Sequence, residues 1–339
     1  MIYRFNSSFF SQLKTRYSRG IIGRYSNYFE FRNDCNICGN NNLERISKRD
    51  RYGCFYPLNY CLDCYNVFSL IFLKKEKLAE YYNGKANQIK IIKDPKFLFK
   101  NRISQESYAF DRFNFISENL KKELKKNTLI VEIGCSDGSN LYPFEIQNYN
   151  VLGFDFNSKR IDIGKSYGLN LIQINSNKLV FSKLEKNRSH KLVYLSHLIE
   201  HLTDFYEYFK NLVNSMCIND LIFIETPCID YVLNYNKNPF KLYPKDTNLI
   251  NYLQLEHTYF FQEDQLNKLI SLFGFRKLVS NDIYRGLFVL ECKNYPERKA
   301  IHEKMADLFN PKILQRIIML ENKYKSETGK LKYIYKHIY

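Results

Sequence analysis

The 339-residue chain is 45% hydrophobic and has a net charge of +16, so it can bury a large core and is long enough for two or three compact units. It has no apolar run of the roughly 18 to 20 residues that a membrane span needs, and no continuous apolar stretch of a signal peptide. We therefore expect a cytoplasmic protein whose nine cysteines are reduced or metal-bound rather than paired in disulfides.

The excess positive charge lies mainly at the two ends of the chain. Residues 1–34 form a basic N-terminal extension of charge +4, and residues 293–339 carry +6, which together make ten of the sixteen charges. The charge is therefore better explained by solvated ends and by a general bias toward Lys than by a surface for nucleic acid.

Two CxxC pairs follow the extension. Cys35 and Cys38 form the first pair, Cys61 and Cys64 the second, and 22 residues separate them. Four thiolates about 2.3 Å from a Zn²⁺ ion make a closed, structural site. We predict a zinc ribbon over residues 35–75, in which a short hairpin links the pairs and the metal replaces a core. Four unrelated thiols or a redox pair are the alternatives, and they explain two neighbouring pairs less well.

Strands and helices alternate in the middle of the chain. Residues 76–126 are predicted to be a helical lead-in and residues 127–293 one α/β domain. Strands are predicted at 128–135, 151–156, 190–197 and 221–227, and helices at 105–126, 137–149, 158–169 and 203–216, the last capped by Thr203 or Asp204. This order predicts a Rossmann-like, doubly wound sheet with its ligand at the carboxyl ends of the strands.

The loop after the first of these strands indicates which cofactor is bound. From Gly134 to Gly138 it reads Gly-Cys-Ser-Asp-Gly, which lacks the second glycine of a dinucleotide loop and the Gly-Lys-Ser/Thr of a phosphate loop. Glu132 and Asp137 would repel a diphosphate but can face the ammonium group of a sulfonium ligand. Asp155 ends the next strand, 21 residues after Gly134, where a carboxylate can accept both ribose hydroxyls. These features predict S-adenosylmethionine.

The segments IVEIGCSDGSNL, GFDFNSKRIDIGKSYGL and LSHLIEHLTDFYEYFKNLVNSMCINDLIFIETP resemble the motifs of class I S-adenosylmethionine-dependent methyltransferases. With the four cysteines, residues 35–292 are similar to sugar C-methyltransferases that act on nucleotide-linked keto-deoxysugars. The resemblance implies that the methionine part is lined by Glu132, Gly134, Cys135, Asp137 and Gly138, the ribose by Asp155, the adenine by Phe156, and the floor by Ser196 and His197. It allows His201 either a place near the cofactor or a structural one.

The acceptor side is predicted in a long aromatic insert, residues 227–261. Those C-methyltransferases have a Tyr-His-Glu-His run there, and this chain has Gln254-Leu255-Glu256-His257, which matches in its second half. A histidine held by a carboxylate can remove a proton from a carbon beside a ketone or from a hydroxyl. His257 is therefore the candidate base and Glu256 its partner, unless the two are a structural pair at a helix entry.

The family to which the chain is similar continues into a second nucleotide-binding-like domain, whereas residues 294–339 are predicted to form a helical tail. We expect a methyltransferase acting on a sugar, either nucleotide-linked or a precursor of a surface polysaccharide. The alternatives are an RNA methyltransferase, although nucleic acid is an improbable partner, and a non-catalytic S-adenosylmethionine-binding protein. The sequence leaves the acceptor atom and the oligomeric state open.

Overall fold

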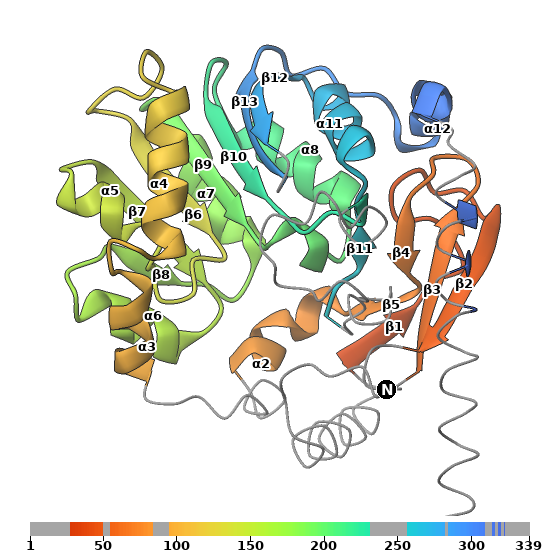
Figure 1. The fold of residues 1–339 in the computed structure, drawn as a ribbon, viewed down its shortest axis with the longest axis horizontal. Coiled ribbons are helices and arrows are strands. Elements are labelled where there is room, and N and C mark those ends of the chain that lie inside the picture. Colours follow the sequence, from red (N-terminus) through yellow and green to blue (C-terminus); the bar gives the residue numbers. More distant parts are fainter. Residues whose placement is uncertain are drawn as a thin grey trace, which may run out of the picture. The chain divides into compact units, whose positions relative to one another are not determined.

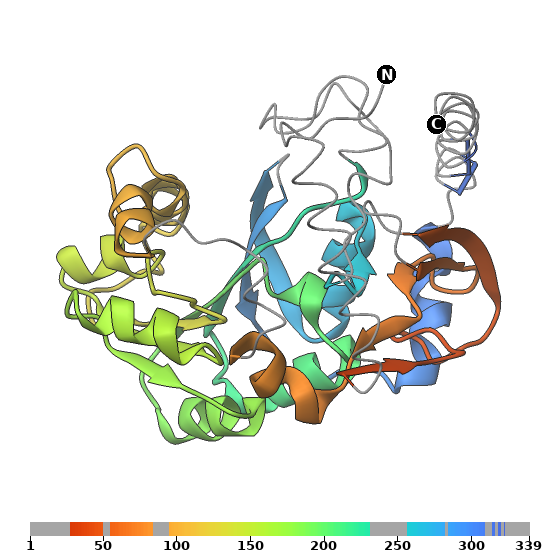
Figure 2. The same ribbon diagram turned by 90° about the horizontal axis from the view of Figure 1, so that it is seen from below.

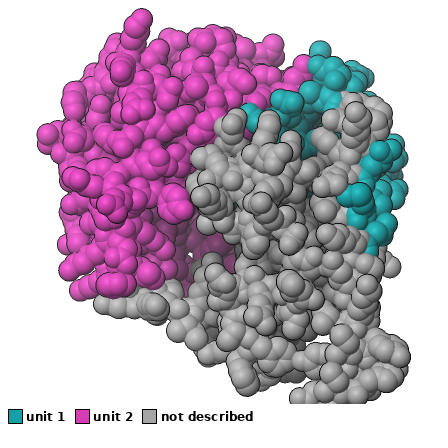
Figure 3. Space-filling view, in the orientation of Figure 1, with its two compact units in different colours: residues 1–72, 227–266, 297–339 teal, residues 73–226, 267–296 magenta. Residues whose placement is uncertain are grey.

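The computed structural model describes residues 28–49, 55–83, 95–230, 256–281 and 284–308, together with 314–315, 318–319 and 322. Most of the predicted N-terminal extension, the greater part of the insert with Gln254 and Leu255, and most of the predicted tail lie outside the described residues. The chain divides into two compact units, coloured separately in Figure 3. We call residues 1–72, 227–266 and 297–339 the ribbon unit, and residues 73–226 and 267–296 the sheet unit.

The sheet unit is built on a seven-stranded sheet with the order β12-β13-β10-β9-β6-β7-β8 (Figure 1). The strands are β6 (Leu129–Ile133), β7 (Asn150–Asp155), β8 (Leu171–Gln173), β9 (Lys191–Ser196), β10 (Leu221–Glu225), β12 (Phe275–Asn281) and β13 (Arg285–Leu290). The strands from β8 to β10 run parallel, and β13 is antiparallel to both of its neighbours. The chain moves outward from β6 to β8 and then returns to the other side of β6, so strand order reverses between β6 and β9.

Helices cover both faces of this sheet, as Figures 1 and 2 show. They are α2 (Leu78–Asn83), α3 (Pro95–Arg102), α4 (Tyr108–Asn119), α5 (Tyr142–Ile146), α6 (Ser158–Lys165), α7 (Asn177–Lys186), α8 (Phe205–Ser215) and α11 (Glu263–Leu272), with short 3₁₀ turns at Lys75–Lys77 and Ile199–His201. The core on one face joins Phe99 of α3, Ile116 of α4 and Phe144 of α5 to alternate residues of the strands, such as Ile130 and Leu192. α7 packs against α8 through Phe181 and Tyr208.

The predicted α/β class and the Rossmann-like sheet are confirmed, with all four predicted strands in place. The helix predicted at 137–149 is shorter, because Gly138 has a φ of +75° and the helix of α5 begins only at Tyr142. Of the two possible caps for α8, Asp204 is the N-cap, since its carboxylate accepts from the Glu207 N–H at 3.1 Å. β8, α7, β12 and β13 were not predicted from the sequence.

The ribbon unit contains a four-stranded antiparallel sheet with the order β11-β4-β3-β2. Its strands are β2 (Leu43–Arg49), β3 (Phe55–Cys61), β4 (Val67–Ser69) and β11 (Tyr259–Phe260), and a second, two-stranded sheet pairs β1 (Phe29–Phe31) with β5 (Ile71–Leu73). The pairing of β2 with β3 confirms the predicted hairpin between the two CxxC pairs. The described part of the tail has 3₁₀ turns at Arg298–Ala300 and Ala306–Leu308 on either side of α12 (Ile301–Met305).

Candidate functional site

The loop after β6 lies where the strand order of the sheet reverses, the usual place for a ligand in this architecture. The N–H groups of Gly134 and Cys135 both donate to the Phe154 carbonyl, at 2.8 and 3.0 Å, so the loop is held against the end of β7. Gly134 and Gly138 have φ values of +78° and +75°, which L-residues rarely adopt. A Cβ on Gly138 would also lie 2.9 Å from the Leu169 side chain. The loop therefore needs its two glycines.

Asp155, at the end of β7, faces this loop. One carboxylate oxygen accepts from the Ser136 N–H at 2.8 Å and the other from the Asn157 N–H at 2.7 Å. Burial raises the pKa of Asp155, and these two hydrogen bonds counter that effect. A carboxylate oxygen has two acceptor positions, so each still has one free for a ribose hydroxyl.

Phe156, the residue predicted beside an adenine, stacks on Tyr82 of α2 with 6.1 Å between ring centroids and 13° between ring planes. The side-chain amide of Asn83 donates to the Phe156 carbonyl and accepts from the Ser158 N–H at 2.9 Å. α2 is thus fastened to the turn between β7 and α6. This second ring was not predicted from the sequence.

Asp137 is completely buried and is engaged by the protein. Its carboxylate is 2.7 Å from Arg102 of α3 and 3.3 Å from Arg160 of α6, and it accepts from the Ser139 N–H at 3.3 Å. The sequence placed this carboxylate against a ligand ammonium. In the structure two arginines neutralise it, so its observed contacts fix the loop to two neighbouring helices.

Glu132, at the end of β6, is only 1% exposed. One carboxylate oxygen accepts from the Asn140 side chain at 2.7 Å, and the other, Oε2, has no hydrogen-bond partner among the described residues. Burial raises the pKa of Glu132 to about 8, although Asn140 and Arg112 favour the ionised form. An unsatisfied buried carboxylate at this edge suits a ligand that brings its own positive charge, as the ammonium group of S-adenosylmethionine does.

Cys135 is 3% exposed, and burial raises the pKa of its thiol well above the ordinary value. Its sulfur packs against Gly153 of β7, where a Cβ would be only 2.7 Å away. The thiol therefore fills space between the loop and β7.

Ser196 is the last residue of β9, and His197 follows it. Both lie on the other side of the point where strand order reverses. His197 has a φ of +50°, and its N–H donates to the Glu225 carbonyl at 2.8 Å. Its ring nitrogens are each 3.2 Å from a buried carboxylate, Glu200 at Nδ1 and Glu225 at Nε2. Desolvation lowers the pKa of His197, but the two carboxylates more than offset this and raise it to about 9. Half of the ring is exposed, so solvent screens part of this effect.

Glu225, at the end of β10, is the centre of a charged cluster that the sequence analysis missed. Besides His197 it binds Arg112 of α4 and Arg285 of β13, and Arg285 also lies 2.6 Å from Asp111. Burial raises the pKa of Glu225, but His197 and Arg112 more than offset this and lower it well below the usual range. Arg112 also donates to Asn140 at 3.1 Å, which connects the cluster to Glu132.

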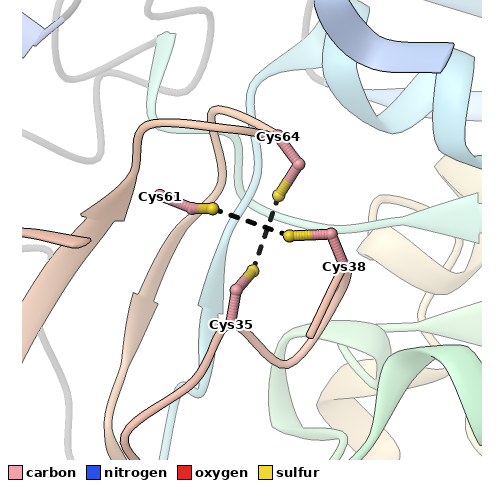
Figure 4. A group of neighbouring side chains, drawn as sticks. All are labelled: Cys35, Cys38, Cys61 and Cys64. Atoms are coloured by element: carbon pink, nitrogen blue, oxygen red, sulfur yellow. Dashed lines mark hydrogen bonds between the residues drawn. The ribbon is translucent and has the colours of Figure 1, made fainter. Parts of the chain in front are cut away.

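The four predicted metal ligands come together in the ribbon unit, with their sulfurs directed to one point (Figure 4). The Cys35 and Cys64 sulfurs are 3.5 Å apart and those of Cys38 and Cys61 are 3.7 Å apart, and all four side chains are buried. Zinc bound tetrahedrally at about 2.3 Å requires sulfurs about 3.8 Å apart, so the cluster fits such an ion. Burial raises the pKa of the Cys35 and Cys64 thiols, an effect that a bound cation would oppose.

Glu256 and His257 also belong to the ribbon unit, directly before β11. His257 is 7% exposed, and its ring centroid is 6.0 Å from that of Phe260. The sheet unit therefore contains all of the residues predicted to bind the donor, and the ribbon unit contains the four cysteines and the predicted base.

None of the helices in the described part of the chain has the length and hydropathy to cross a membrane.

Comparisons with known proteins identify relatives of this chain. The chain is 27% identical over 118 residues to the ubiquinone biosynthesis O-methyltransferase of Rickettsia bellii (strain OSU 85-389) and 25% identical over 118 residues to that of Rickettsia prowazekii (strain Madrid E). These matches cover 34% of this chain and 49% and 47% of the relatives, so the chain spans about half the length of the curated relatives it matches.

A solved S-adenosylmethionine-dependent methyltransferase from Archaeoglobus fulgidus is also similar, at 20% sequence identity and a TM-score of 0.39, over 53% of this chain and 74% of that one. Residues 103–280, more than half of the chain, match a family model described as a methyltransferase domain. The chain therefore belongs to this methyltransferase family.

Proposed function

We propose that this methyltransferase acts on a sugar, either nucleotide-linked or a precursor of a surface polysaccharide, in the cytoplasm. The observation that supports this most is the four-cysteine ribbon beside a Glu-His pair, both of which the sequence shares with sugar C-methyltransferases. The Rickettsia relatives are named O-methyltransferases, which keeps oxygen as well as carbon among the acceptor atoms.

The proposed donor site uses the residues at the carboxyl ends of the strands. S-adenosylmethionine, when bound, supplies a methyl group on a positively charged sulfur. Glu132 offers its unpartnered oxygen to the ammonium group, and Asp155 accepts the ribose hydroxyls with the positions that Ser136 and Asn157 leave free. Phe156 and Tyr82 bring aromatic surface for the adenine, and the backbone of the loop turns toward the methionine part because Gly134 and Gly138 adopt positive φ values.

The proposed acceptor chemistry depends on His257. Methylation at carbon requires a proton to leave the position beside a ketone, and methylation at a hydroxyl requires the O–H proton to leave, so one base serves either reaction. A neutral imidazole takes that proton, and Glu256 favours the imidazolium that results. We also propose that Cys35, Cys38, Cys61 and Cys64 hold a structural zinc ion, since their spacing leaves no position open for water.

Isotope labelling tests the proposal. The protein is incubated with S-adenosylmethionine labelled in its methyl group and a panel of nucleotide sugars and RNAs, and the labelled product is identified by NMR. A labelled sugar with a C-methyl or O-methyl shift supports the proposal and fixes the acceptor atom. Label in RNA would overturn the sugar assignment. Binding of S-adenosylhomocysteine without transfer to any acceptor would indicate a binding protein.

His257→Gln tests the base. We expect transfer to fall by at least about a hundredfold, as for loss of a general base, while the affinity for S-adenosylhomocysteine stays within about twofold of wild type. His302→Gln, in α12, is the matched control. Unchanged turnover in His257→Gln would return His257 to a structural role.

A further inference from the structure

The strand that follows His257 is part of the ribbon sheet. β11 pairs antiparallel with β4, so that Tyr259 lies opposite Phe68 and Phe260 opposite Val67. The Ser69 N–H donates to the Thr258 carbonyl at 2.8 Å and extends the pairing toward His257. Figure 1 shows β11 beside β4, although some 190 residues separate them along the chain. The backbone next to His257 is thus fixed by a strand that begins three residues after Cys64.

The beginning of the predicted acceptor insert is attached to the same place. The Ile229 N–H donates to the Phe261 carbonyl at 2.8 Å, and the Asp230 carboxylate accepts from the Glu263 N–H at 2.7 Å. Residues 231–255 lie outside the described part of the chain. The residues before them are hydrogen-bonded to the segment 258–263, and the residues after them, 256 and 257, lead directly into that segment. The ribbon unit therefore holds both ends of the insert.

Two buried glutamines join this segment to the second cysteine pair. Gln262 donates from its side chain to the Tyr65 carbonyl at 2.9 Å, and Gln265 donates to the Cys64 carbonyl at 3.0 Å. Gln262 is 7% and Gln265 2% exposed, so neither carbonyl can exchange its partner for bulk water without local opening. A side-chain amide that points at a specific loop carbonyl specifies position, whereas apolar packing alone would tolerate a shift.

We infer that the ribbon positions the segment 256–263, which contains His257, and that Gln262 and Gln265 transmit the geometry of the second cysteine pair to this segment. The inference rests on the proposed function of His257 as the base. Its consequence is a division of roles: the state of the ribbon controls the acceptor step, and the donor site in the sheet unit does not depend on it.

The test uses the full chain carrying Gln265→Met or the double change Gln262→Met and Gln265→Met, with Gln147→Met, an exposed glutamine of the sheet unit, as the matched control. Hydrogen exchange is followed at the Ser69, Ile229 and Glu263 amides, which hold the insert. We expect exchange there to accelerate at least tenfold, the pH profile of transfer to shift, and the affinity for S-adenosylhomocysteine to stay within twofold of wild type.

Removal of metal from wild type with a chelator gives a second perturbation that needs no substitution. The same three amides should then exchange faster, again with unchanged donor affinity. Wild-type exchange and an unmoved pH profile in the double variant would overturn the inference, as would loss of donor binding in step with the ribbon. If the amides respond but no sugar is methylated by wild type, the coupling stands and the proposed function fails. If sugars are methylated and the amides do not respond, only the coupling fails.

Discussion

We expect the buried carboxylate of Glu132 to make donor binding depend on pH. Its pKa is raised to about 8, so near pH 7 only about a tenth of the free protein carries the ionised form. If the ligand ammonium is the partner of the unpaired oxygen, the ionised form binds and a proton leaves on binding. The affinity for S-adenosylhomocysteine should then rise about eightfold between about pH 7 and pH 8.5, with close to one proton released per ligand near pH 7.

The raised pKa of Glu132 also affects the stability of the protein without ligand, and here a rise in pH is unfavourable. The folded state keeps a proton that the unfolded chain loses near its ordinary pKa of 4.5, so stability without ligand falls as the pH rises from there toward 8. The limiting slope is about 1.4 kcal/mol per pH unit. Glu132→Gln keeps the acceptor for Asn140 and resembles the protonated acid, so this fall should disappear.

Calorimetry in buffers with different ionisation enthalpies counts the protons, and urea unfolding at several pH values measures the stability. Wild type and Glu132→Gln are compared at each pH, which subtracts the contributions of His197 and Asp155. The reasoning is refuted if binding releases no proton near pH 7, or if Glu132→Gln retains the wild-type dependence of affinity on pH.

Three further changes test the loop, the ribose contact and the metal. Gly138→Ala should destabilise the protein by about 2 to 4 kcal/mol in urea unfolding, since it combines a positive φ with crowding, whereas Gly168→Ala, with φ +86° and open space, should cost only about 1 to 2 kcal/mol. Equal losses would exclude crowding. Asp155→Asn should weaken S-adenosylhomocysteine binding about tenfold by calorimetry, and undiminished affinity would remove Asp155 from the ribose site. Metal analysis of the wild type should find roughly one zinc per chain. Cys35→Ser should abolish this zinc, whereas Cys292→Ser, a change at an exposed cysteine, should leave it bound.

The donor loop was predictable because its signals are local. Strand, glycine turn and the next strand end follow one another within about 25 residues, and the parallel sheet brings Glu132, Gly134 and Asp155 to one edge whatever the rest of the chain does. The arginines at that edge were not predictable. Arg112 and Arg285 come from α4 and β13. The sequence around a single arginine on a helix or strand does not indicate which carboxylate it binds in the fold.

Asp137 is a second residue whose partners could not be predicted from the sequence. Its position in the loop indicated a carboxylate close to the ligand, and the loop is where expected. Only the fold shows that Arg102 and Arg160 reach it from two helices and satisfy it. The position of a residue in a motif predicts where its Cα lies in the fold. The partners of its side chain depend on helices and strands that the motif does not contain.

The attachment of β11 to β4 gives a physical reason for the proposed zinc ribbon and the proposed acceptor insert to occur in one chain. Two residues of strand are too short to hold a position alone, since even a two-stranded hairpin is marginal in water. β11 is held by its pairing with β4, and β4 is held by its pairing with β3, which ends at Cys61. Cys61 ends β3 and Cys64 lies in the turn before β4, so we expect the position of the last strand to depend on the four-cysteine cluster. The histidine near β11 therefore lies at the end of a series of contacts that begins at this cluster.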